Sequence, residues 1–169
     1  MKKFASTVAV VLCASIAEAG DEAALRHQLQ LLRGTWRWAS LEVNGGVFSE
    51  KELAETPTPF VVRFEQNRVT RVEPGKAPLW HPFTIRPGTT PKQLDLSDDN
   101  GELWLAIYSI DKDVLRIASG VQDFRLLAPE GSKPAIRRPK SFDAEKEAKG
   151  NVALVVVTLK RLQNELHKK

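Results

Sequence analysis

The spacing of hydrophobic residues changes once along the chain, from a helical period to a strand-like one. Between Asp21 and Arg33 the apolar residues recur near helical spacing, which predicts a short amphipathic helix that Gly34 ends. The apolar positions of this helix are Ala24, Leu25, Leu29 and Leu32. From Gly34 onward apolar and polar residues alternate in short runs, which predicts β-strands. We expect the apolar stripe of the helix to lie against one end of the β-structure.

Eight short segments have strand character and are separated by turn-forming residues. They cover residues 35–43, 60–65, 68–73, 79–86, 93–97, 103–110, 114–118 and 152–161. In the first segment Trp36 and Trp38 share one parity, whereas Leu41 and Val43 share the other. We therefore expect a β-bulge near Ala39 that lets this strand serve both sides of a closing sheet.

Three local features refine this pattern. Ser49 and Glu52 have the spacing of a capping box, so residues 49–54 are expected to form a helical turn. Pro82 lies inside a strand segment and has no N–H to donate, which predicts an edge or a bend there. A long polar connection covers residues 120–150, with a short helical turn expected near 143–149. Its basic cluster, which we interpret as a solvated loop, is Lys133, Arg137, Arg138 and Lys140.

Strands joined mostly by tight turns must be antiparallel, because parallel neighbours need long crossover connections. A chain of this kind either splits into a sandwich or closes into a barrel, and closure removes both exposed edges. The sequence therefore favours an all-β fold of about eight antiparallel strands in an up-and-down barrel with a short N-terminal helix. The sandwich is the alternative.

The first residues have the pattern of a secretory signal peptide. Lys2 and Lys3 precede an uncharged apolar run over residues 4–16, and Ala17-Glu18-Ala19 supplies small residues at the cleavage positions. The run is shorter than the roughly 20 apolar residues of a spanning helix, so no stable membrane span is predicted. We expect cleavage after Ala19 and export to the periplasm or the extracellular space. A lipoprotein modified at Cys13 is the alternative, and Leu12 is too large for its cleavage site.

Cleavage would divide the chain into four parts: a leader (1–19), a helix (20–33), a barrel domain (34–161) and a polar tail (162–169). The leader holds Cys13, the one cysteine of the chain, so the mature protein would form no disulfide. The leader also holds two lysines and one glutamate, and the net charge therefore falls from +4 to +3. This mild, scattered charge argues against nucleic acid as a partner, because nucleic-acid binders carry a denser basic stripe.

Two motifs at opposite ends of the strand region resemble the lipocalin superfamily. Gly34-Thr35-Trp36 opens the first strand, and Leu159-Lys160-Arg161 closes the last. In lipocalins a G-x-W motif on the first strand is covered by a basic residue from the last strand. The resemblance implies that Trp36 plugs one end of the barrel and that Arg161, or alternatively Lys160, lies over it. A guanidinium suits that position because it stacks on indole and binds carbonyl groups.

More closely, residues 31–161 resemble a small uncharacterised, lipocalin-like domain family known chiefly from planctomycete bacteria. The matching segments are Leu32-Arg33-Gly34-Thr35-Trp36, Phe64-Glu65, Thr90-Pro91-Lys92 with Asp95-Leu96, Ile107-Tyr108, Arg138-Pro139 near Phe142, and Leu159-Lys160-Arg161. The chain departs from the family at Gln66-Asn67, where glycine is common, and over residues 120–136, which are longer than usual. The family has no established activity, so the resemblance implies an architecture rather than a function.

The residues that usually carry catalysis are not arranged in a known motif. The histidines are His27, His81 and His167, and none has the spacing of a metal site. The acidic turn at residues 98–102 lacks the ligand spacing of a calcium loop, and there is no serine elbow or phosphate-binding glycine loop. We therefore predict no enzyme activity, metal or cofactor. An enzyme would require His81 to meet Asp95 or Glu102 at one mouth of the barrel.

The aromatic residues leave two functional hypotheses, because an eight-stranded barrel either holds one small ligand or is filled by side chains. The first is an exported binding module for a small apolar molecule, with the interior lined by Phe64, Phe83, Trp104 and Tyr108. The second is a structural or protein-interaction domain of the cell envelope with a filled barrel, recognised through the 120–150 loop by unspecified proteins. The residues that would fill it are Phe60, Val62, Phe64, Phe83, Ile85, Leu94, Leu96, Leu105, Ile107, Leu115, Ile117, Val155 and Val157.

Overall fold

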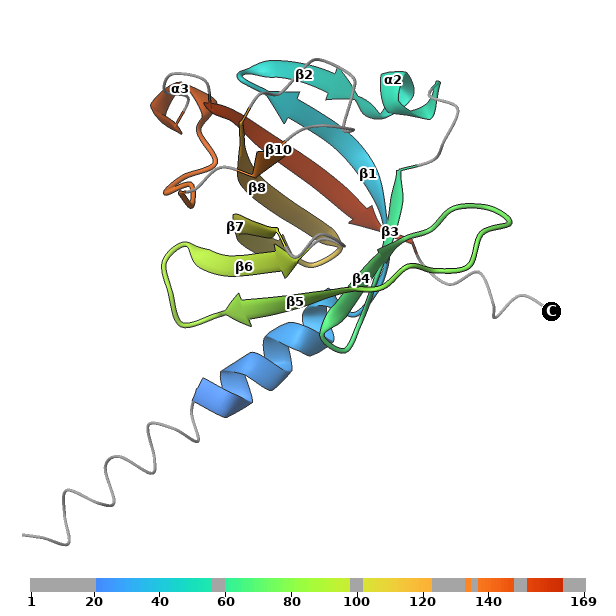
Figure 1. Cartoon of the computed structure of the whole chain (residues 1–169), viewed down its shortest axis with the longest axis vertical. Coiled ribbons are helices and arrows are strands. Elements are labelled where there is room, and N and C mark those ends of the chain that lie inside the picture. The colour runs from blue at the N-terminus through green and yellow to red at the C-terminus, as the bar shows by residue number, and fades with distance from the viewer. Residues whose placement is uncertain are drawn as a thin grey trace, which may run out of the picture.

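One antiparallel sheet closes on itself, and a helix lies beneath it (Figure 1). The structure is a computed structural model that describes residues 21–55, 60–97, 102–122, 133–134, 137–147 and 152–162. Eight strands form the ring in the order β1-β3-β4-β5-β6-β7-β8-β10, and β10 pairs with both β8 and β1. The predicted all-β fold, an up-and-down barrel with a short N-terminal helix, is confirmed.

The ring strands are β1 (Gly34–Val43), β3 (Val61–Glu65), β4 (Arg68–Arg71), β5 (His81–Arg86), β6 (Lys92–Ser97), β7 (Leu103–Asp111), β8 (Val114–Gln122) and β10 (Val152–Arg161). Two short strands lie outside the ring: β2 (Gly46–Ser49) pairs with the second half of β1, and β9 (Lys133–Pro134) pairs with the end of β8. Residues 21–32 form the N-terminal helix, and the other helices are α2 (Glu50–Ala54) and α3 (Ala144–Glu147).

Several predicted segments lie outside the described residues. They are the leader (1–19), the turn at 98–101, residues 123–132 of the long connection, and the tail after Leu162. Within the described ranges, no helix has both the length and the apolar character that are needed to cross a membrane. The predicted capping box is confirmed, because Ser49 and Glu52 bond reciprocally at the start of α2.

β1 contains the expected bulge, which aligns the apolar residues of this strand. The pairing of β1 with β10 shifts between Trp38 and Ser40. Opposite residues of an antiparallel pair share a face, and Trp38 and Leu41 lie opposite Leu159 and Val157, which both belong to the inner core. The bulge thus keeps Trp36, Trp38, Leu41 and Val43 on the inner side of the barrel. The switch of parity in the sequence is therefore explained by a bulge at the predicted place.

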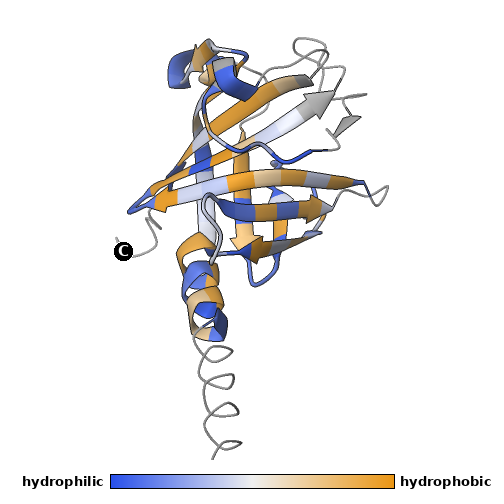
Figure 2. Ribbon diagram, turned by 90° about the vertical axis from the view of Figure 1, so that its left-hand side faces the viewer, coloured by the Kyte–Doolittle hydropathy of each residue, from blue (hydrophilic) through white to orange (hydrophobic). Residues whose placement is uncertain are grey.

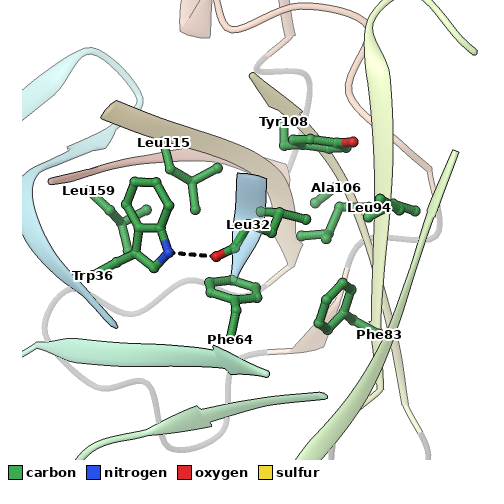
Figure 3. Close-up of a cluster of buried hydrophobic side chains, with 10 residues drawn as sticks. Leu32, Trp36, Phe64, Phe83, Leu94, Ala106, Tyr108, Leu115 and Leu159 are labelled. Atoms are coloured by element: carbon green, nitrogen blue, oxygen red, sulfur yellow. Dashed lines mark hydrogen bonds between the residues drawn. The ribbon is translucent and has the colours of Figure 1, made fainter. Parts of the chain in front are cut away.

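The inner core occupies the helix end of the barrel (Figure 3). Its buried members come from the helix and from strands all around the ring: Leu32, Trp36, Phe64, Phe83, Ile85, Leu94, Ala106, Tyr108, Leu115 and Leu159. Leu25 and Leu29 pack against it from the helix, so this part of the apolar stripe faces the barrel as predicted. Figure 2 shows this helix, which carries both hydrophobic and hydrophilic residues, at the end of the barrel. Ala24 is exposed, because this first turn of the helix projects beyond the end of the barrel.

A second core lies on the outer face of β7, β8 and β10. Ile107 is fully buried there with Leu154 and Val156, and Phe142 packs against them. Ile107 was expected inside the barrel together with Leu105. The alternation of β7 instead directs Ala106 and Tyr108 inward, so Leu105 and Ile107 face outward.

Phe142 belongs to residues 137–147, which we call the outer arm. The arm is anchored by Arg138, whose guanidinium binds the Asp95 carboxylate and the carbonyl oxygens of Leu94 and Ala106. The Arg138 side chain is only 16% exposed. Our interpretation of the basic cluster as a solvated loop was therefore wrong for this residue. The predicted helical turn within the arm is confirmed as α3.

Pro82 lies where the pairing between neighbouring strands of the ring is shortest. β4 and β5 pair at only two positions, Arg68 with Pro82 and Val69 with His81. Because proline cannot donate a ladder hydrogen bond, a long pairing is blocked at this point. The prediction of an edge was wrong, because β5 is paired with both β4 and β6, and Pro82 instead lies at a short pairing inside the closed sheet.

We predict that the Asp95–Arg138 ion pair stabilises the fold through the outer arm. Arg138→Gln should lower the free energy of unfolding by about 2–4 kcal/mol, because it leaves the buried Asp95 carboxylate without its closest partner. Arg86 also contacts Asp95, at 3.2 Å, but its side chain is 57% exposed, so Arg86→Gln should cost less than about 1 kcal/mol. Urea unfolding followed by tryptophan fluorescence measures both values. Equal losses in the two variants would contradict the prediction.

Candidate functional site

The base of the barrel is closed by Trp36, which is fully buried. The indole Nε1 donates a hydrogen bond to the carbonyl oxygen of Leu32 at 2.8 Å (Figure 3). This bond joins the first strand to the last turn of the helix, where carbonyl groups have no partner within the helix. Trp36 therefore fixes the helix against the end of the barrel.

Arg161 lies over Trp36 and binds the same helix terminus. Its guanidinium carbon is 4.1 Å from the centre of the indole ring. Its Nη atoms donate to the carbonyl oxygens of Leu31 and Arg33, both at 2.6 Å, and its Nε donates to the Asp113 carboxylate at 3.1 Å. A cation at a helix C-terminus is favourable because it meets the negative end of the helix dipole.

Lys160, the alternative cover for Trp36, faces the other side of the sheet. It lies opposite Arg37 in the β1–β10 ladder, and its ammonium group is 3.0 Å from Glu50. The alternation of β10 explains the difference, since consecutive residues of a strand point to opposite faces. Arg161, but not Lys160, can therefore reach the indole.

Gly34 is required at this position for two reasons. Its backbone φ of +133° is a conformation that side chains disfavour. A Cβ atom on Gly34 would also lie 2.8 Å from Nη1 of Arg161. The glycine of the G-x-W motif thus leaves room for the guanidinium that covers the tryptophan.

A buried polar group connects the helix to the barrel wall. The Gln28 side-chain oxygen accepts hydrogen bonds from the Lys92 ammonium at 3.0 Å and from the Tyr108 hydroxyl at 3.4 Å. Burial raises the pKa of Tyr108 to about 12, because the charged phenolate is poorly solvated there.

Three of the four aromatic residues proposed to contact a ligand belong to the inner core at the helix end of the barrel. Phe64, Phe83 and Tyr108 are 3%, 2% and 1% exposed. The rings of Phe64 and Phe83 meet edge to face, with centroids 5.4 Å apart. In this structure these side chains contact their neighbours in the inner core and leave no surface for a ligand. Trp104 differs, because it is half-buried and lies outside the inner core.

Inward-facing residues at the other end of the barrel keep partial contact with solvent. We call this set the upper tier, and each of its members is half-buried. Its members are Trp38, Leu41, Val43, Phe60, Leu96, Trp104, Ile117, Val155 and Val157. The lower half is thus closely packed, whereas the inward-facing apolar residues of the upper half keep partial exposure to solvent. A surface of this kind is suited to bind an apolar molecule.

The upper tier contains one ordered stack. Trp38 and Phe60 are parallel within 21°, with ring centroids 4.7 Å apart. The guanidinium carbon of Arg71, a residue of β4, lies 5.2 Å from the centre of the Phe60 ring. Arg71 could not be found from the sequence pattern, because its inward direction follows from the β3–β4 register, which places it opposite Val62.

The residues that an enzyme would need are separated. His81 shares its strand face with Phe83 and Ile85, which point inward, whereas Asp95 faces the outer arm. They therefore lie on opposite faces of the sheet. Glu102 is exposed just before β7, and His27 is exposed on the helix. Among the residues that the structure describes, no three potential metal ligands gather.

Comparison with known proteins identifies no relative of this chain. No protein-family model, no curated protein and no solved structure matches the chain. The likeness to the planctomycete family stays a prediction from the sequence motifs.

We predict that Gly34→Ala destabilises the protein by about 2–4 kcal/mol, because it combines an unfavourable φ with displacement of Arg161 from its carbonyl partners. Gly88→Ala is the matched control, since a Cβ there meets nothing within 4 Å, and it should change stability by less than about 1 kcal/mol. Chemical denaturation followed by circular dichroism compares the two. A tolerated Gly34→Ala would show that Arg161 can move at little cost.

We predict that Tyr108 titrates late in the folded protein. It is the single tyrosine of the chain, so the ultraviolet absorbance of tyrosinate reports it alone. The folded midpoint should lie near pH 12, whereas the urea-unfolded chain should titrate near about 10. The unfolded state loses this proton first, so the stability of the wild type should fall relative to Tyr108→Phe as the pH rises between these values. A folded midpoint near that of the unfolded chain would contradict the burial of the phenol.

Proposed function

We propose that this chain is an exported, lipocalin-like barrel that binds a small apolar molecule against the upper tier. The observation that carries the proposal is the difference between the two halves of the interior. Inward-facing residues such as Trp36 and Phe64 are fully buried at the helix end, whereas Trp38, Trp104 and Val155 are half-buried at the other end. Burial of this remaining apolar surface would favour binding by about 25 cal/mol per Å².

Export is supported by the sequence alone, through the basic start, the apolar run and the Ala17-Glu18-Ala19 site. A binding role outside the cytoplasm fits a chain whose mature part needs no reduced thiol. The closed base supports the proposal in another way. Because Trp36 and the helix fill that end, a ligand would have to enter and leave at the upper tier.

We predict that the purified mature protein raises the emission of the neutral apolar probe N-phenyl-1-naphthylamine in a saturable manner. Val155→Phe and Val43→Phe should each weaken probe binding by about tenfold, because the added ring would cover apolar surface that the probe needs. Val47→Phe is the control, since Val47 lies on β2 opposite Glu42 of β1 and is 63% exposed. It should bind the probe as the wild type does.

The variants must first be shown to fold, by circular dichroism and thermal melting. Mass spectrometry of the protein under native conditions would also detect a lipid that co-purifies with it. If the folded wild type shows neither saturable probe binding nor a bound lipid, the binding function is refuted. The second hypothesis, a structural or protein-interaction role in the cell envelope, would then replace it.

A further inference from the structure

The upper tier has a cation at its border, which bears on the chemistry of the ligand. Arg71 lies opposite Val62 in the β3–β4 ladder, and Val62 packs against the inner core. Because opposite residues share a face, Arg71 starts on the inner side of the barrel. Its side chain is 42% exposed, so the guanidinium is accessible from solvent at the border of an apolar surface.

Aromatic rings hold this guanidinium in place. It lies over Phe60, which stacks on Trp38, and Trp38 packs against the inner core. A guanidinium over an aromatic face is attracted by the ring and is less free to change rotamer. The stack therefore presents the charge next to the apolar residues of the upper tier.

The hydrogen-bonding capacity of Arg71 is largely unused. Its one acidic neighbour in the described chain is Glu73, which approaches Nε at 3.7 Å. Glu73 is engaged more closely by Lys76, at 2.6 Å, and Lys76 is the main cause of the lowered pKa of Glu73. The two Nη groups of Arg71 have no acceptor among the described residues, so they are available to a carboxylate, which a guanidinium binds with two parallel hydrogen bonds.

Arg63 provides an internal comparison. It lies on β3, but it faces the outer side, opposite Thr70. Its guanidinium is 3.1 Å from Glu65 and 6.0 Å from the ring of Trp80. Its side chain is 54% exposed, close to the exposure of Arg71. The two arginines therefore share residue type, hairpin and stacking, and differ in the face of the sheet that they occupy.

We infer that the ligand of the upper tier is an amphipathic anion: an apolar body that lies against the half-buried residues, with a carboxylate that binds Arg71. This inference rests on the proposed binding function and specifies its ligand class. The mild positive charge of the chain, +4 overall and +3 without the predicted leader, also favours the approach of an anion over that of a cation.

Displacement of N-phenyl-1-naphthylamine by three single-chain amphiphiles tests the inference. Dodecanoate, dodecanol and dodecyltrimethylammonium share an alkyl chain and differ in head-group charge, and each is used below its micelle concentration. The wild type should bind dodecanoate about tenfold more tightly than dodecanol, and the ammonium compound most weakly. The preference should shrink as ionic strength rises, because the contact is partly exposed to solvent.

Arg71→Gln should remove the preference for dodecanoate while keeping the affinity for the neutral probe, and Arg63→Gln should keep both. If the wild type binds the probe but treats dodecanoate and dodecanol alike, the anion inference is overturned and the binding function stands. The inference also fails if Arg63→Gln removes the preference as fully as Arg71→Gln does. If the wild type binds neither the probe nor any amphiphile, the binding function itself has failed.

Discussion

The guanidinium of Arg161 is the contact on which the arrangement of the barrel depends. It joins the last residue of β10 to the indole of Trp36 on β1 and to two carbonyl oxygens at the end of the N-terminal helix. A helix terminus with unpaired carbonyl groups would be costly at the edge of an apolar core. Arg161 and Trp36 together donate hydrogen bonds to three carbonyl groups at this end of the helix, those of residues 31 to 33. The helix can therefore end against the core without leaving these carbonyl groups unpaired.

This contact also decides which end of the barrel is available to a ligand. The helix places Leu32 into the base, where it packs with Trp36 and the other residues of the inner core. Interiors packed to this degree leave little room for a guest. The partly solvated surface inside the ring is therefore found at the upper tier, where the chain has no comparable stopper among its described residues. Closure at one end and the partly exposed apolar residues at the other, where we propose binding, both follow from the position of the helix.

Much of this architecture could be predicted from local pattern. The helix, the strands, the capping box and the bulge at Ala39 each follow from the spacing of a few neighbouring residues. Pairings that depend on register or on distant segments could not be predicted in the same way. The sequence places Asp95 near turns and Arg138 in a basic cluster, and nothing local indicates that the outer arm brings them together across more than forty residues. Ile107 has the pattern of an inner residue because it is apolar, yet it is buried from outside by Phe142.

Arg71 shows why the candidate site depends on register more than on composition. The β3–β4 hairpin turns at Gln66 and Asn67, and Gln66 adopts the left-handed conformation, with φ of +54°. This two-residue turn sets Arg71 opposite Val62 and Thr70 opposite Arg63. A slip of one residue would exchange the two faces of β4, turning Thr70 inward and Arg71 toward solvent. The position of this charge at the border of the upper tier is therefore determined by the turn that begins β4, and the proposed preference for an anionic ligand depends on that turn.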